Sequence, residues 1–232
     1  MTGGASGIGA ATVARLRRDR MRVAALDLAA SSGADVHVRV DVSSPQEAAR
    51  GIDEAAAALG GLDVVVACAG VAGRGTVAET PPEEWERVFA VNVRGVYLTA
   101  RAAIPHLREA GGGGIVLVAS QLGLVAAAGA AAYCASKGAV VQLARAMAVD
   151  HAAEGIRVNC VCPGPTTTPL LEEYFALAPD PARERRRYEE AQVHGRLIEP
   201  EEIADAIAYL ASPQAASTIG AALVVDGGYS IR

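Results

Sequence analysis

A tyrosine and a lysine stand four residues apart in the stretch AAYCASKGAV (131–140), whose other side chains are small or apolar. Residues at positions i and i+4 share one face of a helix, so Tyr133 and Lys137 point the same way. A free phenol has a pKa of about 10, and a neighbouring ammonium group lowers it by favouring tyrosinate. The pair therefore predicts a tyrosine that acts as a general acid or base. Taken alone, the same spacing is also typical of a buried ring with a snorkelling amine.

A glycine-rich turn opens the sequence. MTGGASGIGA places Gly3, Gly7 and Gly9 in the spacing T-G-x-x-x-G-x-G, directly before a helical stretch. Glycine lets the backbone approach a pyrophosphate closely, and a helix N-terminus supplies N–H donors and the positive end of its dipole. The turn therefore predicts a dinucleotide-phosphate site, although an ordinary tight turn is the alternative.

Acidic residues end the next two apolar runs. Asp27 follows the glycine turn at the spacing where a carboxylate can accept hydrogen bonds from both ribose hydroxyls of NAD and would repel the 2′-phosphate of NADP. No arginine or lysine follows it directly, so NAD is favoured over NADP. The alternative for Asp27 is a surface turn residue. Asp41 could meet the adenine amino group or cap the helix that begins at Pro45.

Short β-branched runs alternate with alanine-rich helical patterns along the whole chain. Strands are predicted at 22–28, 36–42, 62–69, 114–120, 156–162 and 221–227. Helices are predicted at 9–19, 45–59, 82–110, 131–153 and 200–211. Near-continuous apolar strands separated by helices indicate a doubly wound, Rossmann-like parallel sheet in an α/β fold. Residues 1–232 are interpreted as one dinucleotide-binding and catalytic domain, in which a long segment at about 166–197 covers the active site.

The first strand of this architecture is missing or truncated. Only Met1 and Thr2 precede the glycine turn, where a central strand is expected. A shortened chain, a misassigned start and a sheet that lacks its middle strand all remain open. The last would leave buried backbone groups unpaired, which is costly.

Further motifs occur in a fixed order around the tyrosine–lysine pair. Ser120 stands thirteen residues before Tyr133, and Asn92 lies upstream in VNVRG. CPGPTTTP (162–169) and VVDGGYS (224–230) follow downstream. Together with TGGASGIG, these motifs make the chain resemble a classical short-chain dehydrogenase/reductase over its whole length after the missing strand.

The resemblance implies hydride transfer between NAD(H) and an alcohol or ketone, with a catalytic set of four residues: Asn92, Ser120, Tyr133 and Lys137. In this reading Tyr133 exchanges the proton, Ser120 steadies the substrate oxygen, and Lys137 holds the nicotinamide ribose. Asn92 holds a water in a proton relay, and Thr168 meets the nicotinamide carboxamide. The implied cofactor site comprises Gly3, Ser6, Gly7, Ile8, Gly9, Asp27, Asp41, Val42, Ala69, Gly70, Tyr133, Lys137, Pro163, Gly164, Thr166 and Thr168.

One departure from the family pattern stands after the strand at 62–69. The family usually has N-N-A-G there, whereas this chain has ACAG (67–70). The missing asparagine side chains predict some lost rigidity, while Gly70 still lets the backbone run close to the adenine ribose.

The substrate pocket is expected from 71–75, 121–127 and the cover, with Ser120, Gln121 and Tyr133 in contact with substrate. These stretches carry few charges, which favours a small neutral secondary alcohol or ketone. An NADPH-dependent 3-oxoacyl thioester reductase is an alternative, in which His194 or the RERRR run (183–187) would meet an anionic handle. A catalytically idle NAD-binding protein is another.

Composition narrows the range of partners and locations. The net charge is −5 and the basic cluster RERRR stands among glutamates, so no nucleic-acid partner is expected. No apolar run approaches the roughly 18 residues that span a bilayer, and no signal peptide is recognisable. The spacing of the four cysteines fits no zinc pattern, so we expect no metal and buried free thiols in the cytoplasm. Excess apolar surface on the predicted helices 82–110 and 131–153 suggests self-association. The family resemblance implies a homo-oligomer, a tetramer or a dimer, built on these two helices.

Overall fold

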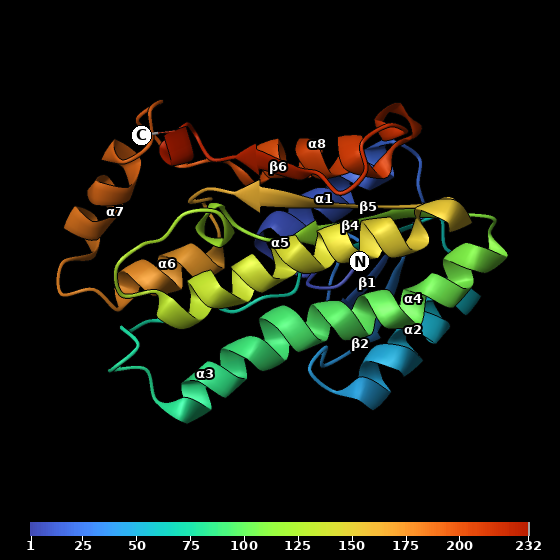
Figure 1. Cartoon of the computed structure of the whole chain (residues 1–232), viewed down its shortest axis with the longest axis horizontal. Helices are drawn as coiled ribbons and strands as arrows, with labels where there is room; N and C mark the ends of the chain where they lie inside the picture. The colour runs from blue at the N-terminus through green and yellow to red at the C-terminus, as the bar shows by residue number, and fades with distance from the viewer. Residues whose placement is uncertain (232) are drawn as a thin grey trace.

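Parallel strands form the sheet in the order β2-β1-β3-β4-β5-β6, with β1 and β3 joined through Thr2 (Figure 1). The computed structural model describes residues 1–231. Its strands are β1 (Ala24–Asp27), β2 (Val36–Arg39), β3 (Val64–Ala67), β4 (Gly113–Val118), β5 (Ile156–Pro163) and β6 (Ala222–Val225). Strands follow one another outward from the centre in both directions, which confirms the doubly wound prediction. Folds of this kind bind ligands where the strand order reverses, beyond the carboxyl ends of the strands.

The first residues of the chain occupy the centre of the sheet. Thr2 forms parallel bridges with Leu26 of β1 and Ala67 of β3. Its N–H donates to the Val66 carbonyl at 3.0 Å, and the Gly3 N–H donates to the Leu26 carbonyl at 2.9 Å. Within residues 1–231 no full strand precedes β1. These few bonds nevertheless fix the glycine turn at the carboxyl edge of the sheet.

Helices cover both faces of the sheet (Figure 1). On one face α2, α4 and α5 share a core with the strands, and on the other α1 and α8 pack against each other. The helices are α1 (Gly7–Arg18), α2 (Pro45–Leu59), α3 (Pro82–Phe89), α4 (Val96–Glu109), α5 (Ala131–His151), α6 (Pro169–Ala176), α7 (Pro181–Glu190) and α8 (Pro200–Ala211).

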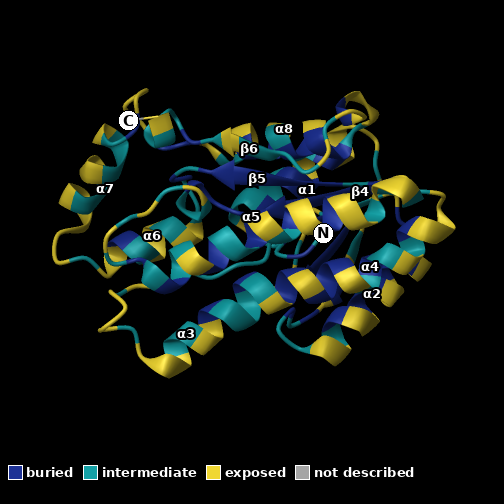
Figure 2. Ribbon diagram, in the orientation of Figure 1, coloured by how far each residue is buried: buried dark blue, intermediate teal, exposed yellow. Residues whose placement is uncertain are grey.

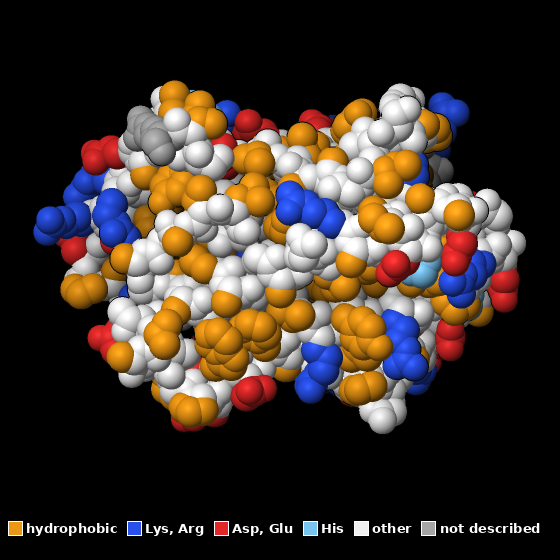
Figure 3. Space-filling model, in the orientation of Figure 1, with side chains coloured by type: hydrophobic (Ala, Val, Ile, Leu, Met, Phe, Trp, Pro, Cys, Tyr) orange, Lys and Arg blue, Asp and Glu red, His pale blue; other side chains and the backbone are white. Residues whose placement is uncertain are grey.

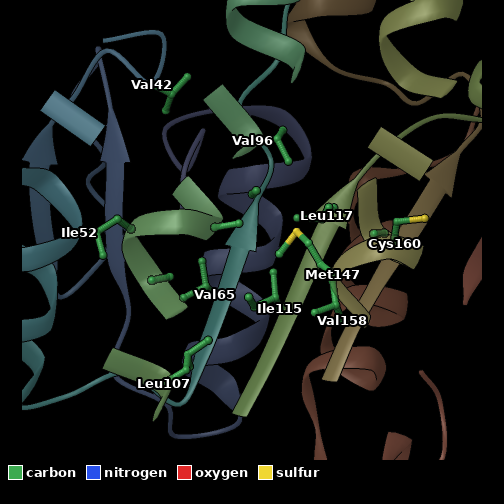
Figure 4. Packing of buried hydrophobic residues seen from close by; sticks show 14 of the residues in the cluster. Val42, Ile52, Val65, Val96, Leu107, Ile115, Leu117, Met147, Val158 and Cys160 are labelled. Carbon is green, nitrogen blue, oxygen red and sulfur yellow. The ribbon is translucent and has the colours of Figure 1, made fainter. Parts of the chain in front are cut away.

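The central strands are buried on both faces, as a parallel sheet between helices requires (Figure 2). Val65, Ile115 and Val158 belong to the cluster that Leu107 and Met147 complete from α4 and α5 (Figure 4). Residues that alternate with them pack in the cluster of α8: Val66, Val116 and Val161.

Local end signals explain where the helices begin and end. Pro45 stands in the first turn of α2, the Ser44 hydroxyl accepts the Glu47 N–H at 3.3 Å, and Gly60 ends the helix at φ 81°. The predicted helix 82–110 is interrupted between α3 and α4 by a π-helical turn, Ala90–Gly95. Such turns often occur at functional sites.

All four cysteines are free thiols in the structure. Cys160 and Cys162 are buried and free, whereas Cys68 and Cys134 are free and half-buried. Among residues 1–231, no helix combines the length and the apolar character needed to cross a bilayer.

Candidate active site

A cavity of about 420 Å³ opens beyond the carboxyl ends of β1, β3, β4 and β5. All the predicted cofactor residues line it, and so do Ser120 and Gln121. Asn92 does not. The cover also reaches this cavity, but of the stretches 71–75 and 121–127 only Val71–Gly73 and Gln121–Leu122 do so, and Leu124 is exposed. Arg74 and Gly75 line a second cavity beside it.

The glycine turn is packed too closely for side chains. A Cβ on Gly9 would lie 1.8 Å from the Gly3 carbonyl oxygen. Gly3 has φ +69°, and a Cβ there would lie 2.6 Å from the Ala69 nitrogen. The Ser6 side chain makes no capping hydrogen bond to α1, so the first N–H groups of this helix remain for an anion. This cradle fits a dinucleotide pyrophosphate.

Asp27 is held in place at the end of β1. One carboxylate oxygen accepts the Ala5 N–H and the other accepts the Ala29 N–H, each at 3.0 Å. A carboxylate has about four acceptor positions, so two remain for a ligand. The next residue, Leu28, is apolar and exposed.

Asp41 does not cap α2, which was one of its two predicted roles. Its Oδ1 accepts the Ser43 N–H at 2.8 Å and the Ser43 hydroxyl at 2.7 Å, while Ser44 caps the helix. Asp41 lines the cavity next to Val42.

Lys137 lies buried beside Tyr133, with its Nζ 5.7 Å from the centre of the phenol ring. Nζ donates to the Val118 carbonyl at 2.9 Å. The Ser120 hydroxyl accepts the Leu122 N–H at 3.1 Å and also hydrogen-bonds the Tyr133 phenol. The three catalytic side chains predicted to act together therefore meet in this cavity.

Burial changes the acidity of this pair. Desolvation raises the pKa of Tyr133 to about 12, although the hydrogen bond with Ser120 opposes it. Desolvation also lowers the pKa of Lys137 to about 8. The Tyr133 pKa is therefore raised, the opposite of the lowering predicted from Lys137, because desolvation is the largest effect on this phenol.

Lys137 is the only lysine in the sequence, whereas arginine occurs along the whole chain. Arginine stays protonated at any ordinary pH, whereas a buried lysine amine can titrate. The single lysine among many arginines is a feature of the sequence that could have marked position 137 as functional, but the predictions above did not use it.

Asn92 is fully buried in the π-helical turn. Its amide nitrogen donates to the Val71 carbonyl at 3.0 Å and to the Ser136 hydroxyl at 3.1 Å, and its Oδ1 accepts the Val71 N–H at 2.8 Å. Both amide protons are therefore used to fix the segment after β3 to α5. A Cβ on Gly70 would lie 3.3 Å from the Asn92 Oδ1 and 3.5 Å from the Lys137 Nζ, so these residues converge.

The cover closes the other side of the cavity with α6 and α7. Thr168 caps α6 and packs on Gly7, and its hydroxyl donates to the Thr166 carbonyl at 3.2 Å. Tyr174 and Tyr188 line the cavity with their rings 6.0 Å apart. Both lie in the predicted cover, but sequence could not tell which residues would face inward.

An arginine outside the cover fixes its position. The Arg74 guanidinium lies 4.2 Å from the centre of the Tyr174 ring and donates to the Tyr174 and Leu177 carbonyls, each at 3.3 Å. Cations are favourable at the carboxyl end of a helix.

The basic groups considered for an anionic substrate do not reach the cavity. His194 packs against Gly227, while Arg185 pairs with Glu172 and Arg187 pairs with Glu184. Among residues 1–231, Lys137 is the only lysine or arginine that lines the cavity.

Comparisons with known proteins agree with this geometry. The family model described as Enoyl-(Acyl carrier protein) reductase matches residues 3–230. Cis-4-hydroxycyclohexanecarboxylate dehydrogenase from Sinomonas cyclohexanicum is 42% identical over 243 residues, which cover 99% of this chain and 95% of the relative.

Solved structures extend the similarity to the whole fold. Ligand-free aldohexose dehydrogenase from Thermoplasma acidophilum has a TM-score of 0.94 and 32% identity, covering 100% of this chain and 92% of that one. 3-Ketoacyl-(acyl-carrier-protein) reductase from Brucella melitensis, complexed with NADH, has a TM-score of 0.90 and 32% identity, covering 99% of this chain and 96% of that one. The chain therefore belongs to the classical short-chain dehydrogenase/reductase family and is an oxidoreductase that uses a nicotinamide cofactor.

Proposed function

We propose that this protein transfers hydride between NAD(H) and a small, neutral secondary alcohol or ketone, with Tyr133 as general acid or base. One observation carries the proposal: the glycine cradle, Asp27 and the group Ser120, Tyr133 and Lys137 line a single cavity. When bound, the nicotinamide ring takes hydride from an alcohol carbon or returns it to a ketone.

The side chains divide the remaining work. The Tyr133 hydroxyl gives its proton to a ketone oxygen in reduction and takes a proton from the alcohol in oxidation. The Ser120 hydroxyl donates a hydrogen bond to the same oxygen and stabilises its developing charge. Lys137 holds the cofactor ribose beside Tyr133. Asn92 positions the segment after β3, since its amide protons are already used.

The rest of the predicted cofactor site is proposed to hold the dinucleotide along the cavity. The glycine cradle takes the pyrophosphate, Asp41 and Val42 lie at the adenine end, and the stretch 163–168 lies at the nicotinamide end. Thr168 remains the proposed partner of the carboxamide, although its hydroxyl also caps α6.

Asp27 supports NAD as the cofactor. We expect the protein to bind NADH at least about tenfold more tightly than NADPH, because a fixed carboxylate accepts ribose hydroxyls and repels a phosphate. Fluorescence titration of both reduced cofactors measures this ratio. In Asp27→Asn the ratio should fall, whereas Asp19→Asn, on the surface, should leave it unchanged. Tighter binding of NADPH by the unmodified protein would refute the assignment of Asp27.

The cavity walls support a neutral substrate. Its substrate side is formed mainly by Val71, Leu122, Leu171 and the rings of Tyr174 and Tyr188. The Sinomonas relative is named for an alicyclic secondary alcohol that carries a carboxylate, which supports the ring shape of the substrate and not its neutral charge. The Brucella neighbour keeps a 3-oxoacyl thioester reductase as the alternative, but no arginine among residues 1–231 lines this cavity to bind an anionic carrier.

A panel of secondary alcohols offered with NAD tests the proposal. Formation of reduced cofactor, followed by its absorbance, should be seen with neutral alicyclic or short-chain members. NAD binding without turnover of any alcohol or ketone would favour the idle NAD-binding alternative. Turnover confined to 3-oxoacyl thioesters with NADPH would favour the reductase.

We also propose a homo-oligomer, a dimer or tetramer, located in the cytoplasm and built on the face of α4 and α5. Apolar side chains gather over α3 and α4 (Figure 3). Tyr97 of α4 and Val149 of α5 are exposed, and Trp85 of α3 stacks on Phe89 at 4.6 Å between ring centres. Exposed apolar surface of this kind marks interaction sites. Light scattering of the purified protein measures the number of subunits.

A further inference from the structure

A buried glutamine beside the catalytic serine has an unsatisfied amide. Gln121 is 4% exposed, follows Ser120 directly and lines the cavity with Tyr133. Its Oε1 is fully buried and has no hydrogen-bond partner in the part of the chain that the structure describes. This oxygen is pressed against Gly164, on which a Cβ would lie 2.9 Å from it.

Buried amides in native proteins are nearly always hydrogen-bonded, so an unpaired one calls for an explanation. The amide of Gln121 carries one acceptor and two donors. Its oxygen is packed against Gly164, so its N–H donors are the groups left for a ligand in the cavity. The other walls on the substrate side are apolar, and the Tyr174 and Tyr188 hydroxyls already bond each other. Gln121 is thus the polar group available beyond the catalytic residues.

We infer that Gln121 selects substrates with a second uncharged oxygen close to the reacting carbon, as in vicinal diols and hydroxyketones. This inference rests on the proposed function and deepens it. Ser120 and Tyr133 hold the reacting oxygen, and the neighbouring amide hydrogen-bonds the second one. A carboxylate or sulfonate at that position would have no cationic partner besides Lys137 among the described lining residues.

Oxidation of cyclohexanol and of cis-cyclohexane-1,2-diol with NAD tests the selection. The unmodified enzyme should have a kcat/KM for the diol about tenfold or more above that for cyclohexanol, because an analogue that lacks the hydroxyl leaves the buried amide unpaired. In Gln121→Met this preference should disappear, chiefly through a higher KM for the diol. The kcat/KM for cyclohexanol should fall by less than that for the diol, because only the diol loses a hydrogen bond.

Gln192 provides a matched control. It is 1% exposed and its Oε1 is likewise unpaired among the described residues, but it does not line the cavity. Gln192→Met should therefore keep the diol preference. Loss of the preference in both variants would point to a general loosening of the site and overturn the inference.

Two results would refute the role of Gln121 directly. An equal diol preference in the unmodified enzyme and in Gln121→Met is one. The other is weaker NADH binding by Gln121→Met while the diol preference stays intact, because that result would show that the amide contacts the cofactor.

Calorimetry separates this inference from the proposed function. In Tyr133→Phe with NAD bound, the diol should bind more tightly than cyclohexanol, and Gln121→Met should remove the difference. Equal binding of both alcohols would overturn the inference alone. Absence of binding by either would overturn the proposed function and the inference together.

Discussion

Tyr133→Phe is expected to lower kcat by about a thousandfold, because it removes the hydroxyl that exchanges the substrate proton while keeping the ring that fills the cavity wall. The pKa of about 12 means that this hydroxyl is protonated at neutral pH, ready to give its proton to a ketone. Reduction of cyclohexanone with NADH, measured at steady state, gives kcat directly. Binding of NADH, measured by fluorescence, should change little.

Tyr97→Phe is the control for this substitution. Tyr97 is half-exposed on α4 and lies outside the cavity, so its variant should keep full activity. Tyr133→Phe that retains more than about a tenth of the original kcat would remove the phenol from its role as general acid.

Gly9→Ala is expected to weaken NADH binding by about tenfold to a hundredfold, the equivalent of about 1–3 kcal/mol of overpacking. The added methyl would lie 1.8 Å from the Gly3 carbonyl oxygen, a backbone atom that cannot rotate away as a side chain can. The turn must therefore move, and the helix N–H groups move with it. Calorimetric titration with NADH and thermal unfolding measure the two consequences, weaker binding and a lower Tm.

Gly33→Ala is the matched substitution. The nearest atom to its added methyl, in the side chain of Val13, is 3.9 Å away, which is an ordinary contact. This variant should keep the original affinity and Tm. Unchanged NADH affinity in Gly9→Ala would show that the cofactor phosphates do not depend on this turn.

Sequence was sufficient for the elements whose ends carry their own signals. The predicted bounds of α2 and α8 are those of the structure, since each begins with proline and is followed by a residue that stops helices, Gly60 after α2 and Pro213 shortly after α8. The π-helical turn Ala90–Gly95 inside the predicted helix 82–110 was not foreseeable. Apolar periodicity continues through such a turn almost unchanged, and only the backbone bonds reveal it.

The residues that form the site could be predicted from the sequence, but the direction of the Tyr133 pKa shift could not. The i, i+4 spacing was enough to predict that Tyr133 and Lys137 are neighbours. The direction in which the Tyr133 pKa shifts depends on burial, which a local sequence pattern does not show. The same limit applies to Tyr174 and Tyr188. Their inward orientation is set by the packing of α6 and α7 and by Arg74, which is distant in sequence.

The two ends of the cover meet at one place. The Ile198 N–H donates to the Pro165 carbonyl at 2.9 Å, and the Thr167 N–H donates to the Ile198 carbonyl at 2.8 Å. The segment between them, which contains α6 and α7, thus leaves and rejoins the scaffold beside the same pair of backbone hydrogen bonds. Thr166 and Thr168 belong to the proposed cofactor site, so the part of the cover beyond Thr168 is the part to exchange. Transplanting that part between homologues, together with its Arg74 contact, is a direct route to new substrate ranges.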